Sequence, residues 1–519
     1  MKATSTAIAP LLGKVSRQSA VVFLTRGAAL FLGIGSTILL SRLFGPAGLG
    51  RFRLGSVVVQ LVTAFCVLGL DRALLRYVPI LETRGENARR LLIQGSSVVF
   101  GISLALSAVL LLAAPVLAKS YFRSPEMTDI IRLFSFQVPV LALFRFLSSA
   151  VTAAKRFDFA SKIGNILSPA LFLFLVAALP LVLPSLKGAI VARIMAQLTA
   201  ATILAIFLLQ RNPKLRPTKP AVEGTFRSYF LLSMPLFVIG VGFQLLNQMD
   251  TIMLGHFVSE REVGIYSVAF KVSAFVLIGL EILLPIVAPL FSQFRETNDH
   301  ASIEMLFRAV TKWLCYSALL IFIYIAVFRG QLMHVFGKGF TEGSTVLLIL
   351  AAGQLVSAAT GPTGVLLTMT GKQRWELGNT ISTVAVNFFL NLLLIPKMGM
   401  TGAAAATALS LATINGLKLV QVYRLFGLRA YNLRYLKGIA ALSAAGLAGY
   451  LLRNWLFNAG CGPLSIMPLG GIAVLVITAA GFWLLGLDEE DKVALVGLRT
   501  RQRDIAVVPA ENAVEAPVS

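Results

Sequence analysis

Long apolar runs recur along almost the whole chain, and this feature constrains the fold more than any other. A helix needs about 20 apolar residues to cross the hydrocarbon core of a bilayer. Only short connections that carry charge separate the runs. Charged residues are 13% of the chain, against about 25% in soluble proteins. The pattern therefore predicts an all-α polytopic membrane protein, and it excludes disordered, collagen-like and disulfide-rich secreted chains.

The runs predict fourteen transmembrane helices, with expected limits 20–41, 54–70, 92–114, 131–152, 163–183, 188–209, 229–256, 264–292, 311–332, 344–369, 378–395, 400–424, 436–455 and 466–487. We expect two lobes of six helices, two additional helices and a tail. The corresponding ranges are 1–210 and 229–430 for the lobes, 211–228 for a linker, 431–487 for the additional helices and 488–519 for the tail.

The chain contains an internal repeat with one fixed offset. A shift of 214 residues along the sequence places Gly50 on Gly264, Gly164-Asn165 on Gly378-Asn379, and Gly188-Ala189 on Gly402-Ala403. Loops and apolar runs coincide in phase under this shift, which we call the repeat offset, and the match indicates a duplication. Because each half holds six expected spans, the two halves have the same orientation in the membrane. Parallel repeats of this kind predict a transporter with its site between the halves, near the membrane midplane.

The net charge of +23 predicts membrane orientation rather than nucleic-acid binding. Lys and Arg punctuate the apolar runs instead of clustering on one polar face, and no nucleic-acid-binding motif is present. The connections around 72–90, 211–227 and 295–312 are rich in Lys and Arg, whereas the alternate connections are poor in them. The positive-inside rule then places both termini in the cytoplasm.

Sequence signals of enzymatic or metal chemistry are absent. The chain has no nucleotide-binding glycine loop, no His-Glu-x-x-His and no Gly-x-Ser-x-Gly. Its cysteines and histidines are isolated and lack ligand spacing: Cys66, Cys315, Cys461, His256, His300 and His334. We therefore expect no enzyme activity, no metal site and no bound cofactor.

Ionisable residues inside the expected spans are the first site candidates, because a charge in the membrane usually faces a cavity or a partner. The bases are Arg26, Arg145, Arg193 and Lys271, and the acids are Asp250 and Glu281. Surplus positive charge suits an anionic cargo, and arginine offers a planar fork for phosphate oxygens. Alternatively, the arginines extend to the interface, and Asp250 pairs with Lys271 rather than binding a coupling proton or sodium ion.

Two polar stripes follow helical spacing within expected spans. One contains Gln244, Asn247, Gln248 and Thr251, and the other contains Asn379, Thr383, Asn387 and Asn391. Their amides and hydroxyls are suited to sugar hydroxyls in a wet cavity, with Gln244, Asn247, Gln248 and Asn387 as the main candidates. The alternative is hydrogen bonding between helices.

Two segments carry a resemblance to a known family. They are Ser41–Gly50, followed by a span that ends in Gly69-Leu70-Asp71-Arg72, and Met249–Gly255, followed by Val263–Ala269. They resemble the Wzx-type polysaccharide (O-antigen) flippases of the MOP superfamily, which also holds lipid II flippases and MATE exporters. The resemblance covers roughly 15–430.

The resemblance implies two six-helix lobes around a central cavity in the bacterial cytoplasmic membrane. It implies transport of a polyprenyl-pyrophosphate-linked oligosaccharide from the cytoplasmic to the outer leaflet by alternating access. Its partners would be the bilayer, this lipid-linked cargo and other polysaccharide assembly proteins, without nucleic acid. The alternatives are a MATE-like exporter of small molecules and a non-transporting component of an assembly complex.

Overall fold

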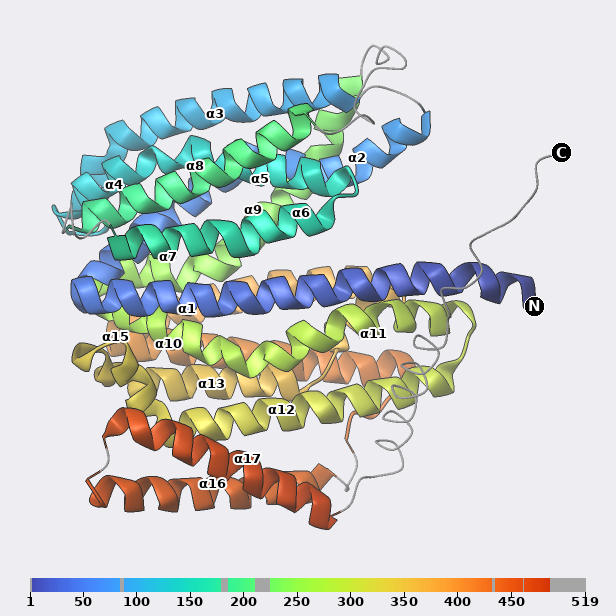
Figure 1. The fold of residues 1–519 in the computed structure, drawn as a ribbon, viewed down its shortest axis with the longest axis vertical. Coiled ribbons are helices and arrows are strands. Elements are labelled where there is room, and N and C mark those ends of the chain that lie inside the picture. Colours follow the sequence, from blue (N-terminus) through green and yellow to red (C-terminus); the bar gives the residue numbers. More distant parts are fainter. Residues whose placement is uncertain are drawn as a thin grey trace, which may run out of the picture.

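The chain folds into a bundle of helices that lie nearly along one direction (Figure 1). The computed structural model describes residues 2–84, 88–178, 185–210, 225–431, 435–460 and 462–485, and these ranges contain no strand. The all-α fold class is therefore confirmed. The expected linker at 211–228 falls largely outside the described residues, and the tail at 488–519 does so entirely.

A first lobe contains the helices α1 (Lys2–Val67), α2 (Leu70–Arg84), α3 (Ala88–Val116), α4 (Met127–Ser135), α5 (Gln137–Ala153), α6 (Phe157–Lys162), α7 (Ser168–Ala178) and α8 (Leu186–Gln210). A second lobe contains α9 (Thr225–Phe257), α10 (Glu260–Ser273), α11 (Ile278–Glu296), α12 (His300–Val335), α13 (Ser344–Ala359), α14 (Thr363–Met369) and α15 (Gln373–Phe426). The helices α16 (Tyr435–Asn458) and α17 (Pro463–Leu485) follow at one edge (Figure 1). Short helical turns connect several of them, at Leu117–Tyr121, Ile163–Leu167, Ala274–Leu277 and Lys338–Gly343.

Two long helices consist of two arms joined at a glycine kink. In α1 the kink is at Gly45, with φ of 65°, and in α15 it is at Gly399, with φ of 57°. Glycine adopts such positive φ angles without steric cost. The chain therefore changes direction at Gly45 within a few residues, and the rest of 42–53 is helical. The expectation of a loop over 42–53 is wrong. We call the end of the bundle with these two kinks the hairpin end, and the end where α1 begins the termini end.

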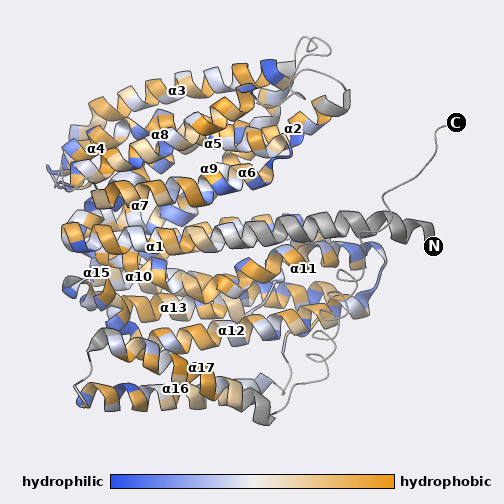
Figure 2. Cartoon of the chain, viewed as in Figure 1, coloured by the Kyte–Doolittle hydropathy of each residue, from blue (hydrophilic) through white to orange (hydrophobic). Residues whose placement is uncertain are grey.

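Hydrophobic residues predominate along the helices of the bundle, as a bilayer requires (Figure 2). Many large apolar side chains are exposed, including Phe31 (73%) and Leu112 (78%). By length and apolar composition, eight helices in the described residues can cross a membrane, or ten if each bent pair is one span. The kinked helices α1 and α15 each count once in this number. The chain is thus a multi-pass membrane protein, while the count of fourteen spans stays a prediction.

The two lobes meet at the hairpin end through a reciprocal backbone contact. A methyl group on Gly50 would overlap the carbonyl oxygen of Glu260, and one on Gly264 would overlap the carbonyl oxygen of Pro46. The repeat offset relates Gly50 to Gly264 and Pro46 to Glu260, so the two parts of the contact are equivalent. The contact therefore lies where a two-fold axis relating the repeats would pass, as the sequence repeat predicts.

Polar contacts around these glycines hold the hairpin end closed. Arg51 forms ion pairs with Glu260 and with Glu126. The Ser124 hydroxyl donates to the other Glu260 oxygen at 2.5 Å. Because these bonds join α1 and the segment before α4 to the start of α10, they connect the first lobe to the second.

The helix α9 packs on both lobes and is bent. Near its start, the Tyr229 hydroxyl donates to the Leu70 carbonyl oxygen at 2.6 Å, and Gly69 lies against the backbone of Phe237. The helix also packs against α15, in the second lobe. The segments Tyr229–Gly242 and Asn247–Phe257 make an angle of 51°. This bend turns one face of α9 toward the space between the lobes.

The contact between Gly50 and Gly264 gives the first prediction. Replacing either glycine with alanine should lower the free energy of unfolding by about 1–3 kcal/mol, because an added methyl group overpacks a close backbone approach. Thermal unfolding of the purified protein measures the effect. Gly101→Ala is the matched control, since a Cβ there has no neighbour within 4 Å. Equal stability of Gly50→Ala and Gly101→Ala would contradict the close contact.

Candidate functional site

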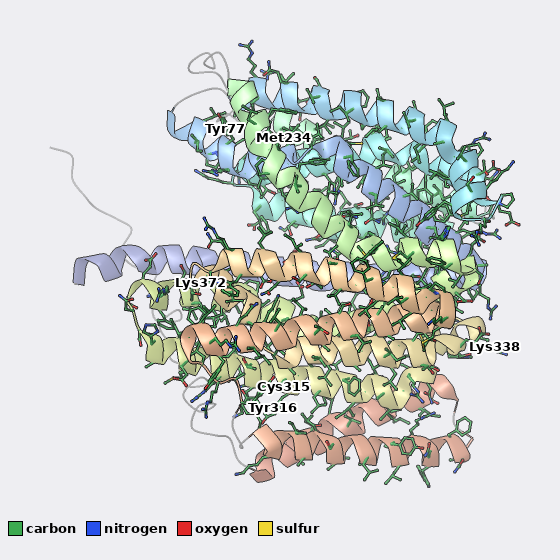
Figure 3. The ribbon with its side chains drawn as sticks, turned by 180° about the vertical axis from the view of Figure 1, so that it is seen from behind. Tyr77, Met234, Cys315, Tyr316, Lys338 and Lys372 are labelled. Atoms are coloured by element: carbon green, nitrogen blue, oxygen red, sulfur yellow. The ribbon has the colours of Figure 1, made fainter. Side chains whose placement is uncertain are left out.

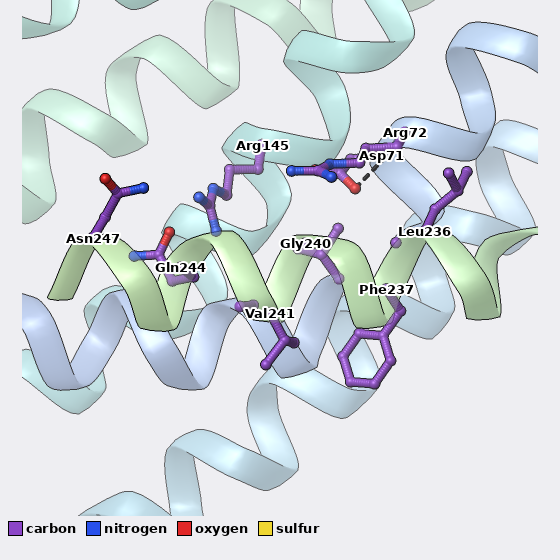
Figure 4. A pocket seen from close by; sticks show the side chains of 12 residues that line it. Asp71, Arg72, Arg145, Leu236, Phe237, Gly240, Val241, Gln244 and Asn247 are labelled. Atoms are coloured by element: carbon purple, nitrogen blue, oxygen red, sulfur yellow. Dashed lines mark hydrogen bonds between the residues drawn. The ribbon is translucent and has the colours of Figure 1, made fainter. Parts of the chain in front are cut away.

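A pocket of about 370 Å³ lies between the second arm of α1, the start of α2, α5 and α9 (Figure 4). Its polar lining comes from both lobes: Asp71, Arg72 and Arg145 from the first, and Gln244 and Asn247 from α9. Leu236, Phe237 and Val241 supply an apolar side. The pocket therefore combines charge, amides and apolar surface between the lobes.

Two guanidinium groups dominate the charge of this pocket. Arg145 points into it from α5, and Arg72 reaches it from the first turn of α2 (Figure 4). The Asp71 carboxylate accepts the backbone N–H of Arg72 at 2.8 Å, and it is the one acid in the described lining. Two cations against one carboxylate leave the pocket with a positive balance, which favours an anionic ligand.

A chain of amides leads from the pocket toward the hairpin end. Gln244 and Gln248 on α9 both donate to the side-chain oxygen of Gln60 on α1, at 3.3 and 3.2 Å. The Gln248 oxygen in turn accepts from Arg53 at 2.9 Å. We call these four residues the amide seam. Because α1 and α9 belong to different lobes, the amide seam joins the lobes beyond the pocket.

Three half-buried cations lie beyond the pocket, and neutral groups contact each of them. Arg53 contacts Gln248, as described. Lys271 on α10 donates to the Gly33 carbonyl oxygen at 2.5 Å and to the Thr37 hydroxyl at 2.6 Å, both on α1. Arg193 on α8 lies over the Phe172 ring, 4.9 Å from its centre, a cation–π contact.

The Asp250 carboxylate does not pair with Lys271. It accepts hydrogen bonds from Tyr266 at 2.8 Å, Asn391 at 2.7 Å and Thr407 at 2.6 Å. Asn391 also donates to Asn387 at 3.0 Å. These residues come from α9, α10 and both arms of α15, so the cluster lies within the second lobe. The ion pair considered between Asp250 and Lys271 is therefore not formed.

The predicted site residues divide into several locations. Arg145, Gln244 and Asn247 line the pocket, and Gln248 belongs to the amide seam. Asn387 lies with Asp250, and Glu281 is an exposed residue of α11 that does not line the pocket. The side chain of Arg26 lies outside the described residues.

The stripe on the first arm of α15 bonds to other helical segments rather than lining the pocket between the lobes. Asn379 exchanges two hydrogen bonds with Gln421, at 2.7 and 2.8 Å, and Asn391 bonds Asp250. Bonding between helices is therefore the interpretation that the structure favours for Asn379 and Asn391. Lys418, on the second arm, pairs with Glu376 at 2.6 Å.

Sequence reasoning missed Arg53, Gln60 and the place of Arg72. Arg53 was assigned to a loop because the charged, glycine-containing segment after Gly45 has the composition of a connection. Its spacing from Gln60, close to two helical turns, was the signal that both share one helix face. Arg72 lies at the end of an expected span, and its sequence position alone does not indicate that it lines a pocket.

The arrangement of the helices is similar to that of two solved membrane proteins. The lipid II flippase MurJ, in an inward closed conformation, superposes with a TM-score of 0.66 over 90% of this chain and 99% of its own, at 15% identity. An inward-facing MATE multidrug resistance transporter gives 0.62 over 79% and 98%, at 13% identity. These likenesses establish the fold.

The sequence itself places the chain in a family. The model of the family described as polysaccharide biosynthesis protein matches residues 39–343, so the chain belongs to this family. Two curated relatives from Haloferax volcanii are named "Probable low-salt glycan biosynthesis flippase Agl15" and "Probable flippase AglR". They are 31% and 30% identical over 37% and 31% of this chain. The matches span 41% and 35% of the relatives' lengths.

The charge of the pocket gives the second prediction. In a variant without the native cysteines, Gly240→Cys should react faster with an anionic thiol reagent than with a cationic one, by roughly threefold to tenfold, because a positive cleft concentrates anions. Position 240 accepts a Cβ at ordinary contact distance from Arg72. Labelling rates at matched ionic strength measure the ratio.

Arg145 provides the control for this labelling experiment. Adding Arg145→Gln should bring the ratio of the two rates toward one, whereas Arg145→Lys should preserve it. If the ratio of anionic to cationic labelling rates were the same in Gly240→Cys alone and in its combinations with Arg145→Gln and Arg145→Lys, the result would contradict a cationic pocket.

Proposed function

We propose that the protein is a flippase that moves a polyprenyl-pyrophosphate-linked oligosaccharide from the cytoplasmic to the outer leaflet of the cytoplasmic membrane. The observation that carries the proposal is a pocket between the lobes with two arginines and two amides. Pyrophosphate oxygens require cationic donors when they leave water. The amides of Gln244 and Asn247 suit the first sugars. The names of the two Haloferax relatives support the same function.

The direction of transport rests on the charge of the connections. The connection at 295–312, which is rich in Lys and Arg, lies at the termini end (Figure 1), and this supports a cytoplasmic location for that end. The hairpin end, which the contact of Gly50 with Gly264 closes, then faces outward. The pocket begins at Asp71 and Arg72, near the termini end, and so lies on the side from which the cargo would enter.

Alternating access requires the lobes to separate at the hairpin end and approach at the other. A ligand shifts such an equilibrium only through unequal affinity for the two states. Lys271 and Arg53 hold the lobes together through neutral acceptors, which a pyrophosphate would outcompete. An anionic headgroup that drew these cations from Thr37 and Gln248 would therefore weaken the contacts between the lobes.

A MATE-like exporter of cationic compounds is the second candidate, and the fold allows it. The balance of charge in the pocket opposes it, because two arginines repel a cationic drug. A non-transporting scaffold in an assembly complex has no need of a charged pocket between two lobes. We therefore place the lipid-linked oligosaccharide first.

For the energy source, we propose that Asp250 is the site of the coupling cation. Its carboxylate is buried, and its bonded partners are neutral. The side-chain oxygen of Asn391 is also buried, with no hydrogen-bond partner in the described structure. Oxygen atoms from Asp250, Asn391 and Thr407 are suitable ligands for a sodium ion, and a proton on Asp250 is the other choice.

Loss of the pocket's positive charge should stop transport. Arg145→Gln should reduce flipping of the lipid-linked oligosaccharide by about tenfold or more, because a charge-assisted hydrogen bond contributes about 1.5–3 kcal/mol. The assay measures accessibility of the cargo in each leaflet of proteoliposomes to an impermeant reagent. Arg145→Lys should retain much of the activity, and Arg132→Gln, an exposed residue on α4, should retain all of it. Normal flux in Arg145→Gln would refute this role.

Removal of the Asp250 charge should abolish coupling. In wild-type protein, sodium at constant ionic strength should raise the unfolding temperature if sodium is the coupling ion, since a ligand that binds only the folded state stabilises it. A dependence of transport on pH alone would identify the proton. Asp250→Asn should lose the dependence on sodium or on pH that the wild-type protein shows. Asp129→Asn, which changes an exposed acid, should keep that dependence. Persistence of the dependence in Asp250→Asn would exclude this site.

A further inference from the structure

A second pocket lies away from the space between the lobes, in a groove between the two arms of α15. Its volume is about 340 Å³. The first arm lines it with Arg374, Trp375, Gly378, Asn379 and Ser382, and the second arm adds Leu417 and Gln421. We call this pocket the α15 groove. Both arms lie on the side of the second lobe that faces the viewer in Figure 3, near the labelled Lys372.

The α15 groove is rich in hydrogen-bond donors that the protein does not use. Arg374, Trp375 and Ser382 are exposed, and no hydrogen bond or ion pair involves their side chains in the described structure. The side-chain amides of Asn379 and Gln421 each donate one hydrogen bond to the other, and each therefore has a second N–H. The acid nearby, Glu376, is paired with Lys418. The other Glu376 oxygen has no hydrogen-bond partner in the described structure, but it is buried and not presented at the surface of the groove. The exposed donors of Arg374 and Trp375 therefore favour a ligand rich in acceptors, such as a phosphate.

The first lobe provides an internal comparison, because the repeat offset gives each groove residue a counterpart. Arg374 and Trp375 correspond to Ala160 and Ser161, and Gln421 corresponds to Phe207. In the first lobe Ala160 is a member of an apolar cluster, against which Phe207 packs. Ser161 bonds Thr25 and Asn165 there, so the first lobe keeps polar contacts at this position but has no cation among the counterparts. The cation, the indole and the second amide are features of the second lobe alone.

The position of the groove along the membrane normal indicates the source of the phosphate. Arg374 and Trp375 are in the first turn of α15, at the opposite end of that arm from Gly399. Tryptophan and arginine at such a helix end lie at the level of lipid headgroups. Donors that face lipid are costly unless an acceptor satisfies them. We propose that the α15 groove binds the phosphate headgroup of an anionic membrane phospholipid. This site is separate from the proposed transport pocket and does not depend on it.

Native mass spectrometry of the full-length protein in detergent, titrated with phosphatidylglycerol, tests the proposal. Arg374→Gln should weaken the tightest lipid site by about tenfold, the effect of losing a charge-assisted hydrogen bond. Gly378→Leu should also remove this site, because it fills the groove where a Cβ meets no neighbour within 4 Å. Lys372→Gln is the matched control, since it removes one positive charge beside the groove without lining it.

The outcomes separate the α15 groove from other sources of binding. Wild-type affinity in Lys372→Gln, together with weak binding in both groove variants at unchanged unfolding temperature, supports the proposal. Equal binding by all four proteins overturns it, as does an equal loss in Lys372→Gln. Displacement of the lipid by inorganic phosphate alone, or tighter binding of polyprenyl phosphate than of phosphatidylglycerol at this site, also overturns the assignment to a phospholipid.

Discussion

The approach of Gly50 to Gly264 is the constraint on which the arrangement of the lobes depends. Two backbones can come this close only where neither residue has a side chain, so the contact fixes where the repeats meet. The ion pairs of Arg51 and the bond from Ser124 gather around it. Helices that diverge from this junction leave room for a pocket toward the termini end. Closure at one end and space at the other therefore follow from one short contact.

Neutral groups, rather than acids, contact three of the half-buried cations, Arg53, Lys271 and Arg193. Lys271 bonds a carbonyl oxygen and a hydroxyl, Arg53 bonds an amide, and Arg193 lies on a phenyl ring. A carboxylate partner would bind each cation more tightly and would compete with an anionic cargo. Neutral partners satisfy the hydrogen bonds and leave the charge uncompensated. Exposed donors, on a smaller scale, also distinguish the α15 groove from its counterpart around Ala160 and Phe207, where no cation is present.

Hydrophobic runs and the fixed repeat offset predicted the helical membrane fold, since both depend on the sequence alone. Arg145, Gln244 and Asn247 could be chosen as candidates because polar side chains in apolar runs are conspicuous, and they line the pocket, while their role in binding stays a prediction. Arg53 was not identified as a candidate. The kink at Gly45 involves fewer residues than a typical loop, so Arg53 already belongs to the helix that follows it. The partners of Asp250 could not be predicted either. Asn391 and Thr407 reach it from a helix far along the chain, and helix spacing does not determine which faces meet.

The two contacts between the lobes that the repeat relates carry different side chains. Where Lys271 bonds Gly33 and Thr37, the repeat offset places Val57 opposite Asn247 and Thr251. Lys271 thus bonds across the contact of α1 with α10, whereas its repeat counterpart Val57 has no polar group, and the contact of α1 with α9 is joined by the amide seam instead. Neutralising the charge would loosen one side before the other. The backbone symmetry would permit a balanced rocking motion, but the side chains would make the lobes part unevenly, with one edge opening while the other still acts as the hinge.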